Sequence, residues 1–176
     1  IGHNVNIEKL LSETPSESLK NFKYPLKISS IGAFRSLKEN KLLLESIGNN
    51  SDYLIAYHGL GPSSDVLIKH VKSSNYFNVT ITLKYEKSEE KSFYEECDIV
   101  NLLEFPVKVA KHLLPNRLYG AVFSGRPVIV FDGSFLAETI SVFGLGFVLN
   151  PRQSLSSQIK AFVNLYDYRT YDIGRT

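Results

Sequence analysis

The sequence contains a single cysteine, Cys97, and no methionine among its 176 residues. One cysteine excludes an internal disulfide and a thiolate-rich metal site, and it is compatible with a reducing compartment. No apolar run approaches the roughly 18–20 residues that a membrane-spanning helix needs. Because it begins at Ile1 and lacks any methionine, the chain is expected to be a piece of a longer polypeptide.

Neither sign of charge is in excess, because 20 Lys and Arg stand against 18 Asp and Glu for a net charge of +2. This balance is too even for nucleic-acid binding by bulk electrostatics. The hydrophobic share of 43% and the charged share of 22% are typical of a globular chain. The length fits one domain or slightly more.

Several motifs of nucleotide and metal sites are also missing. Gly59-Leu60-Gly61 lacks the third glycine and the downstream acid of a dinucleotide fingerprint, which argues against NAD. No phosphate-binding loop of the G-x-x-x-x-G-K-[ST] type is present. The four histidines show no metal-ligand spacing, and only His58, at a predicted strand end, is placed for catalysis or ligand contact.

Short β-branched runs alternate with longer amphipathic ones along the chain. This alternation predicts strands at 26–32, 53–58, 76–83, 98–102, 127–131 and 144–149. It predicts helices at 38–47, 64–71, 88–97 (starting from a Ser88 cap), 115–124, 134–142 and 154–166. The fold class is therefore α/β: a doubly wound, Rossmann-like parallel sheet of about six strands with helices on both faces. Residues 1–23 are expected to be a lead-in or linker and residues 24–176 the domain.

In such a sheet, ligands bind outside the carboxyl ends of the strands. The loops predicted there are rich in glycine and in cations, with Arg35, Lys38 and Arg117 among them. Glycine permits close approach of backbone to a ligand, and helix N-termini attract anions. The pattern favours an anionic ligand, a diphosphate. Alternatively, Gly32 is a plain turn residue, and Arg35 and Lys38 are solvated; Cys97 is expected in the core.

The run LLPNRLYGAVFSGRPVIV, from Leu113 to Val130, resembles the donor-binding signature of retaining glycosyltransferases of the two-domain GT-B architecture, group 1 or family 4-like. Segments 32–38, 95–99, 135–140 and 144–148 are similar to other parts of that family's pattern and follow in the same order. The resemblance covers roughly residues 26–166 and implies the carboxy-terminal half, which binds the nucleotide-sugar donor.

By this resemblance, Arg35, Lys38, Asn116 and Arg117 would contact the donor diphosphate, and the loop of Lys84 and Tyr85 would lie near the base. The complete set of expected donor-binding residues is Gly32, Arg35, Lys38, His58, Gly59, Gly61, Lys84, Tyr85, Pro115, Asn116, Arg117, Leu118 and Gly120. No catalytic residue is assigned. The nucleotide sugar is a substrate, and neither a metal nor another cofactor is expected.

One position departs from the family pattern. The family usually has a glutamate that hydrogen-bonds the donor ribose where this chain has Gly120, and another glutamate eight positions earlier, near His112. Either ribose is recognised differently here, or donor binding is degraded. A third explanation is that Gly120 only permits close helix packing.

The expected function is transfer of a sugar from a nucleoside diphosphate, with UDP favoured, to a glycan or lipid-linked acceptor hydroxyl in bacterial polysaccharide synthesis, such as that of capsule or exopolysaccharide. The expected location is the cytoplasm or the inner face of the membrane. The acceptor, and any peripheral membrane association, would be provided by a missing amino-terminal half, so the chain alone is expected to be inactive. An alternative is a non-catalytic, glycosyltransferase-like partner domain. A flavodoxin-like regulatory domain would need a cluster of acids at strand ends, where only Asp132 is well placed.

Overall fold

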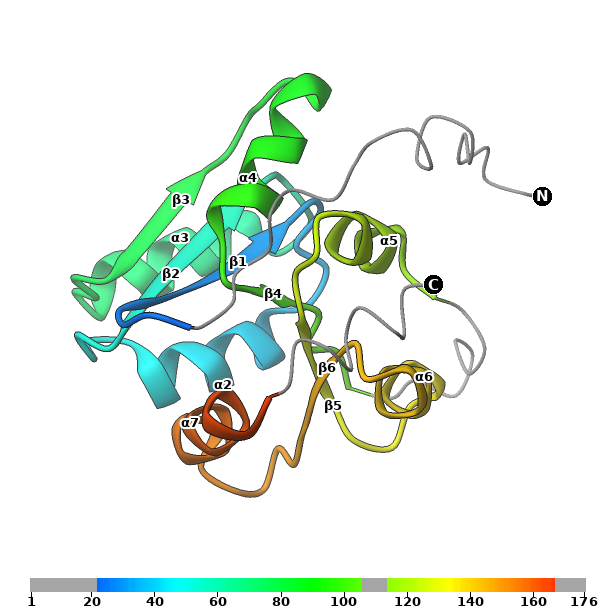
Figure 1. The fold of residues 1–176 in the computed structure, drawn as a ribbon. Coiled ribbons are helices and arrows are strands. Elements are labelled where there is room, and N and C mark those ends of the chain that lie inside the picture. The colour runs from blue at the N-terminus through cyan, green and yellow to red at the C-terminus, as the bar shows by residue number, and fades with distance from the viewer. Residues whose placement is uncertain (1–21, 106–113, 167–176) are drawn as a thin grey trace.

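A computed structural model describes residues 22–105 and 114–166 of the chain as one six-stranded parallel sheet with helices on both faces (Figure 1). The strand order is β3-β2-β1-β4-β5-β6. The strands are β1 (Leu26–Ile31), β2 (Tyr53–His58), β3 (Val79–Thr82), β4 (Ile99–Asn101), β5 (Val128–Phe131) and β6 (Gly146–Leu149). The helices are α2 (Leu37–Ile47), α3 (Ser64–Ser73), α4 (Glu90–Glu96), α5 (Asn116–Phe123), α6 (Phe135–Phe143) and α7 (Leu155–Leu165), with a 3₁₀ turn η1 (Lys87–Glu89) before α4. The predicted fold class is confirmed.

The two faces of the sheet bury two separate hydrophobic clusters. Ile28, Ile55 and Phe131 point to the face covered by α2, α3 and α7, with Leu43 of α2 fully buried there. Val100 and Val130 point to the opposite face, which α4, α5 and α6 cover. Alternation of side chains along each strand produces this division, because neighbouring residues project to opposite faces. Strands that are buried on both faces explain the continuous apolar runs in the sequence.

Strand β3 is shorter than its sequence predicts, because it begins at Val79 rather than at residue 76. The buried Asn78 side chain holds the preceding residues in a loop. Its amide nitrogen donates to the carbonyl oxygens of Ile47, Asn50 and Tyr53 at 3.0–3.1 Å, and its oxygen accepts from the Asn49 N–H at 2.8 Å. These contacts tie the end of α2 to the starts of β2 and β3 at the amino-terminal edge of the sheet.

The predicted helix cap at Ser88 is wrong. The 3₁₀ turn η1 precedes α4, so Ser88 lies within that turn and α4 itself begins at Glu90. The Glu86 N–H donates to the Glu89 carboxylate at 2.6 Å, and the Glu89 N–H donates back to the Glu86 carbonyl oxygen at 2.9 Å. This reciprocal pairing fixes the turn in place of a serine cap.

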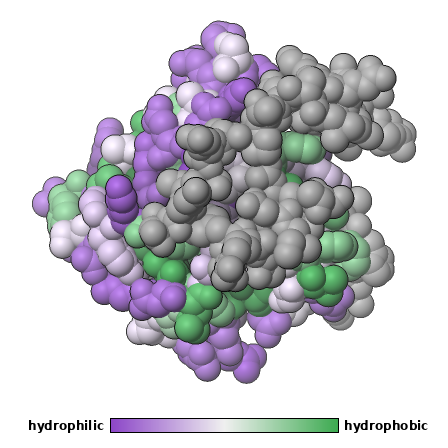
Figure 2. Space-filling view, viewed as in Figure 1, coloured by the Kyte–Doolittle hydropathy of each residue, from purple (hydrophilic) through white to green (hydrophobic). Residues whose placement is uncertain are grey.

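Apolar side chains remain exposed on α6, where the space-filling view shows hydrophobic surface (Figure 2). Val142 and Phe143 are 77% and 51% exposed. Within residues 22–105 and 114–166, no helix combines the length and apolar character required to cross a bilayer. The expected lead-in at residues 1–23 lies almost entirely outside the described residues, so that boundary stays a prediction.

Candidate functional site

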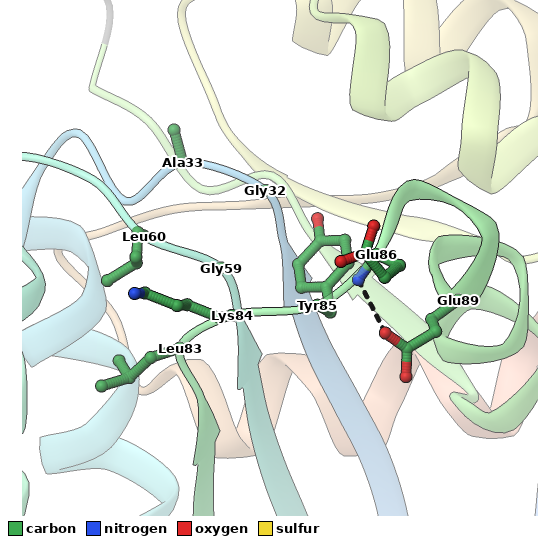
Figure 3. Close-up of a pocket in the computed structure, with 9 residues that line it drawn as sticks. All are labelled: Gly32, Ala33, Gly59, Leu60, Leu83, Lys84, Tyr85, Glu86 and Glu89. Carbon is green, nitrogen blue, oxygen red and sulfur yellow. Dashed lines mark hydrogen bonds between the residues drawn. The ribbon is translucent and has the colours of Figure 1, made fainter.

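A cleft of about 580 Å³ opens where β1, β2 and β3 end. It lies at the carboxyl edge of the sheet, where the fold class predicts a ligand. Its lining residues are Gly32, Ala33, Gly59, Leu60, Leu83, Lys84, Tyr85, Glu86 and Glu89 (Figure 3). The cleft therefore brings together four of the predicted residues, namely Gly32, Gly59, Lys84 and Tyr85.

Backbone of Gly32 and Gly59 forms the floor of the cleft. The Gly32 N–H donates to the His58 carbonyl oxygen, and the Gly59 N–H donates to the Thr82 carbonyl oxygen, both at 2.8 Å. A β-carbon on Gly59 would stand 2.3 Å from the Gly32 carbonyl oxygen, and both glycines have positive φ angles, 98° and 131°. Both positions therefore require glycine for their geometry, whatever the cleft binds.

The wall of the cleft at the β3 end carries side chains of opposite character. The Tyr85 ring stands on the side of Glu86 and Glu89, whereas the Lys84 side chain extends toward Leu60 (Figure 3). Burial, followed by the charge of Glu90, raises the pKa of Tyr85, so its phenol stays a neutral hydrogen-bond donor. The combination of an aromatic ring, apolar carbons and polar groups suits a planar ligand part with polar edges.

His58, predicted at the site, does not line the cleft. Its ring is buried and stacks on the Phe93 ring of α4, with centroids 3.9 Å apart and planes 10° from parallel. Phe93 in turn meets Tyr85 edge to face at 5.0 Å. Neither ring nitrogen of His58 has a partner among the described residues. Burial, and then the charge of Lys27, lower the pKa of His58, so the ring is neutral near pH 7.

Cationic side chains lie beside the cleft, at the point where β1 borders β4. The Arg117 Cδ atom lies 3.5 Å from the place where a β-carbon on Gly32 would stand. The Arg117 guanidinium pairs with the Glu104 carboxylate at 2.5 Å. Lys38 lies over the ring of Phe105, the next residue, at 4.5 Å from the ring centroid. Arg117 and Lys38 therefore contact two consecutive residues, Glu104 and Phe105, of the segment after β4.

Arg35 is exposed in the loop between β1 and α2, and its side chain forms no ion pair within the part of the chain that the structure describes. Its carbonyl oxygen accepts a hydrogen bond from the Ser63 hydroxyl at 3.1 Å. The neighbouring Gly61 is a packing residue, because a β-carbon there would stand 2.4 Å from the Phe34 nitrogen. Gly61 also donates its N–H to the Ser64 hydroxyl at 2.7 Å.

Helix α5 begins at this edge without a side-chain cap. Pro115 holds the N-cap position in an extended conformation, and Asn116 and Arg117 open the helix. Their backbone N–H groups and the helix dipole favour an anion there. Leu118 is different, because its side chain is buried in the core and its N–H donates to the Pro115 carbonyl oxygen at 2.9 Å.

Gly120 is covered by an aromatic ring. A β-carbon at this position would stand 2.5 Å from Cζ and 2.6 Å from the hydroxyl oxygen of Tyr94, which belongs to α4. Gly120 thus permits close packing of α4 on α5, which is the third explanation given for this position in the sequence analysis. His112 lies outside the described residues.

Among residues 22–105 and 114–166, no three His, Cys, Asp or Glu side chains are grouped so that they could hold a metal ion. Cys97 is buried in the core, as expected, and burial raises its thiol pKa to about 12. At that pKa the thiol is protonated near pH 7 and is a poor nucleophile.

The expected donor-binding set left out several residues of this edge. Those that line the cleft are Ala33, Leu60, Leu83, Glu86 and Glu89, and Glu104 pairs with a predicted cation. Ala33, Leu60 and Glu86 lie in loops that the strand-end rule selects, and Leu83 and Glu104 follow strand ends closely, so the same rule could have included them. Glu89 is brought to the cleft by the 3₁₀ turn, for which the sequence has no signal.

No protein-family model and no curated protein sequence matches this chain. Solved structures do match. A variant of S. aureus TarM, in complex with fondaparinux, alpha-GlcNAc-glycerol and UDP, superposes with a TM-score of 0.66 at 16% identity over 93% of this chain. Anabaena HepE in complex with UDP gives a TM-score of 0.62 at 13% identity over 89% of this chain. The chain spans 34% of the TarM chain and 43% of the HepE chain.

The C-terminal domain of a group 1 family glycosyltransferase, LpcC from Francisella tularensis, matches over nearly its full length. The TM-score is 0.59 at 19% identity, and the match covers 94% of this chain and 91% of that domain. The size, strand order and coverage agree with the expected architecture. The chain therefore has the fold of the carboxy-terminal domain of a GT-B, group 1 glycosyltransferase.

Proposed function

We propose that the chain binds a nucleoside-diphosphate sugar, with UDP favoured as the nucleotide, at the carboxyl edge of its sheet. The observation that carries the proposal is the position of Arg117. Its side chain lies against Gly32 of the cleft, and its backbone opens the uncapped N-terminus of α5. Complexes of UDP with TarM and HepE, which share the fold, support the choice of ligand class.

In this arrangement the base occupies the cleft beside Tyr85 and Leu83, and the diphosphate lies toward Arg117, Lys38 and Arg35. The polarity of the edge supports this orientation. The cleft is lined by two carboxylates, Glu86 and Glu89, against one cation, Lys84. Arg117 and Lys38 lie at the β1–β4 border, where a diphosphate is repelled less. A nucleotide that spans both regions satisfies both conditions.

The chemistry that follows is glycosyl transfer. When the bond between sugar and diphosphate breaks, negative charge develops on the leaving diphosphate. Preplaced cations and the dipole of α5 would stabilise that charge, and we propose that they do so in place of a metal. The acceptor, a glycan or lipid-linked hydroxyl, would be positioned by another part of a longer protein, in bacterial polysaccharide synthesis in the cytoplasm or at the inner membrane face.

Calorimetric titration of the chain with UDP and with GDP tests the proposal. We expect saturable binding that weakens roughly tenfold or more in Arg117→Ala, because an arginine–phosphate contact is a charge-assisted hydrogen bond. Arg35→Ala should weaken binding as well. Lys72→Ala, which removes an exposed charge in the last turn of α3, is the matched control and should bind as the parent chain does.

A second candidate is a non-catalytic partner domain that has lost donor binding. Two observations favour it: Tyr94 covers the position of the family's ribose-binding glutamate, and Glu104 already neutralises Arg117. Absence of heat from either nucleotide at millimolar concentration, with the chain folded, would support this candidate and refute donor binding.

A further inference from the structure

Glu104, in the segment that follows β4, pairs with the guanidinium of Arg117. One guanidinium nitrogen of Arg117 lies 2.5 Å from a carboxylate oxygen of Glu104. The Arg117 side chain is 21% exposed and that of Glu104 is 49% exposed, so the contact lies at the surface of the edge rather than in the core. The cation on which the proposed diphosphate contact depends is therefore neutralised by a residue of the same chain.

The main chain on both sides of Glu104 is fixed by polar side chains. The Asn101 side-chain oxygen accepts from the Leu103 N–H at 2.9 Å. The Glu39 carboxylate accepts from the Phe105 N–H, also at 2.9 Å. Asn101 and Glu39 are both buried, and hydrogen bonds to buried groups are costly to break. The fold itself therefore presents the Glu104 carboxylate to the cation, which distinguishes this pair from a chance contact between two surface side chains.

We infer that the Glu104 carboxylate competes with the diphosphate of a bound nucleotide for the Arg117 guanidinium, an inference that rests on the proposed function. A diphosphate and a carboxylate that share one guanidinium repel each other, because both are anionic. A guanidinium also binds phosphate most strongly through two parallel hydrogen bonds, and these need donors that are free. Glu104 therefore has to leave Arg117 when the diphosphate binds.

The structure allows this exchange. The half-exposed Glu104 side chain can turn into water, and the exchange costs little because ion pairs in contact with water are weak. The aliphatic part of Arg117 lies beside Gly32, with Cδ 3.5 Å from the place where a β-carbon would stand, so the guanidinium stays next to the cleft. Glu104 is then a specificity-determining residue. It lowers the affinity for an anion at Arg117 and leaves the affinity for an uncharged nucleoside unchanged.

Calorimetric titration of the parent chain and of Glu104→Gln with UDP and with GDP tests the inference. Glutamine has nearly the size of glutamate but no charge. We expect the nucleotide to bind Glu104→Gln about two- to fivefold more tightly, the range that corresponds to an exposed ion pair. Glu45→Gln is the matched control, because it removes the same charge from an exposed position in the second half of α2. It should bind the nucleotide as the parent chain does.

Two further measurements distinguish competition from a general effect of charge. Competition needs the guanidinium, so Glu104→Gln should give no gain in an Arg117→Ala background. A gain of equal size there would show that Glu104 merely repels the ligand, and would overturn the inference. Uridine, which has no phosphate, should bind the parent chain and Glu104→Gln equally when followed by ligand-observed NMR. An equal gain for uridine would overturn the inference as well.

The outcomes separate this inference from the proposed function. If the parent chain binds UDP or GDP and Glu104→Gln binds it no more tightly, the carboxylate does not compete with the ligand, although donor binding stands. If neither the parent chain nor Glu104→Gln binds either nucleotide, the proposed function fails and the inference fails with it.

Discussion

The Tyr94 ring fills the space where a side chain at Gly120 would stand, so replacing this glycine by alanine should destabilise the fold rather than stabilise it. In an unconstrained helix interior, replacing glycine by alanine stabilises by roughly 0.5–1 kcal/mol. Here the added β-carbon would stand 2.5 Å from the Tyr94 ring. We therefore expect Gly120→Ala to lower the free energy of unfolding by about 1–3 kcal/mol, measured by urea denaturation.

The control is the same substitution in a Tyr94→Ala background, which removes the ring. There Gly120→Ala should be neutral or stabilising. An equal loss in both backgrounds would mean that another neighbour causes the strain.

The buried ring of His58 should make the stability of the domain depend on pH. Burial and Lys27 lower its pKa in the folded chain below the ordinary value of 6.5. The unfolded chain therefore binds more protons at His58 once the pH falls below about 6.5, so stability is lost as the pH falls through that value toward the folded-state pKa. Stability from neutral His58 is fully present above pH 7.

We expect His58→Phe to reduce the loss of unfolding free energy between pH 7.5 and pH 5, because a phenyl ring can stack on Phe93 without titrating. Chemical denaturation at several pH values measures this slope. The comparison with the parent chain cancels Asp98, whose pKa is raised by burial and which acts in the opposite sense at more acidic pH. If the unfolding free energy depended on pH equally in the two chains, His58 would not be a source of that dependence.

At the scale of elements, Asn78 connects α2, β2 and β3 through one side chain. Asn78→Ala would leave three carbonyl oxygens and the Asn49 N–H without this partner. We expect a loss of roughly 3 kcal/mol in unfolding free energy. UDP affinity should be unchanged, because Asn78 lies at the edge of the sheet opposite the cleft. Thermal melting and calorimetry on the same preparation check both expectations.

Elements whose apolar periodicity is strong were predictable from the sequence, and those fixed by distant contacts were not. Helix α6 illustrates the first case: the sequence predicts a helix at 134–142, and α6 spans Phe135–Phe143. Its ends also carry local signals, because the Ser134 hydroxyl accepts from the Ala137 N–H and Gly144 ends the helix with a φ of 62°. The start of β3 illustrates the second, since Asn78 bonds to residues about 25–31 positions away.

The site follows the same division. The strand-end rule found Gly32, Gly59, Lys84 and Tyr85, because topology alone brings strand ends together. It failed for the direction of His58. In β2 the side chains of Ile55 and Tyr57 face α2 and α3, so strict alternation turns His58 to the opposite face. That signal was present in the sequence. The pairing of Arg117 with Glu104 depends on packing and could not be inferred.

At the scale of the whole molecule, the chain should bind without reacting. The proposed donor edge is built from residues of this chain, but an acceptor hydroxyl needs a second surface to hold it against the sugar carbon. We expect no transfer above background from UDP-glucose or UDP-GlcNAc with the chain alone. Release of UDP measures the transfer. A variant with Arg117→Ala is the blank. Turnover that exceeds this blank would show that the chain is sufficient for catalysis.

The floor of the cleft is formed by the main chain at Gly32 and Gly59, and each of their N–H groups donates to the carbonyl oxygen at the end of a neighbouring strand. A surface made this way depends on two small residues and on the spacing of strands. Solved structures share this fold at 13–19% identity, so the fold itself is compatible with very different sequences. A side chain at Gly59, by contrast, would collide with the Gly32 backbone and change the shape of the cleft floor directly.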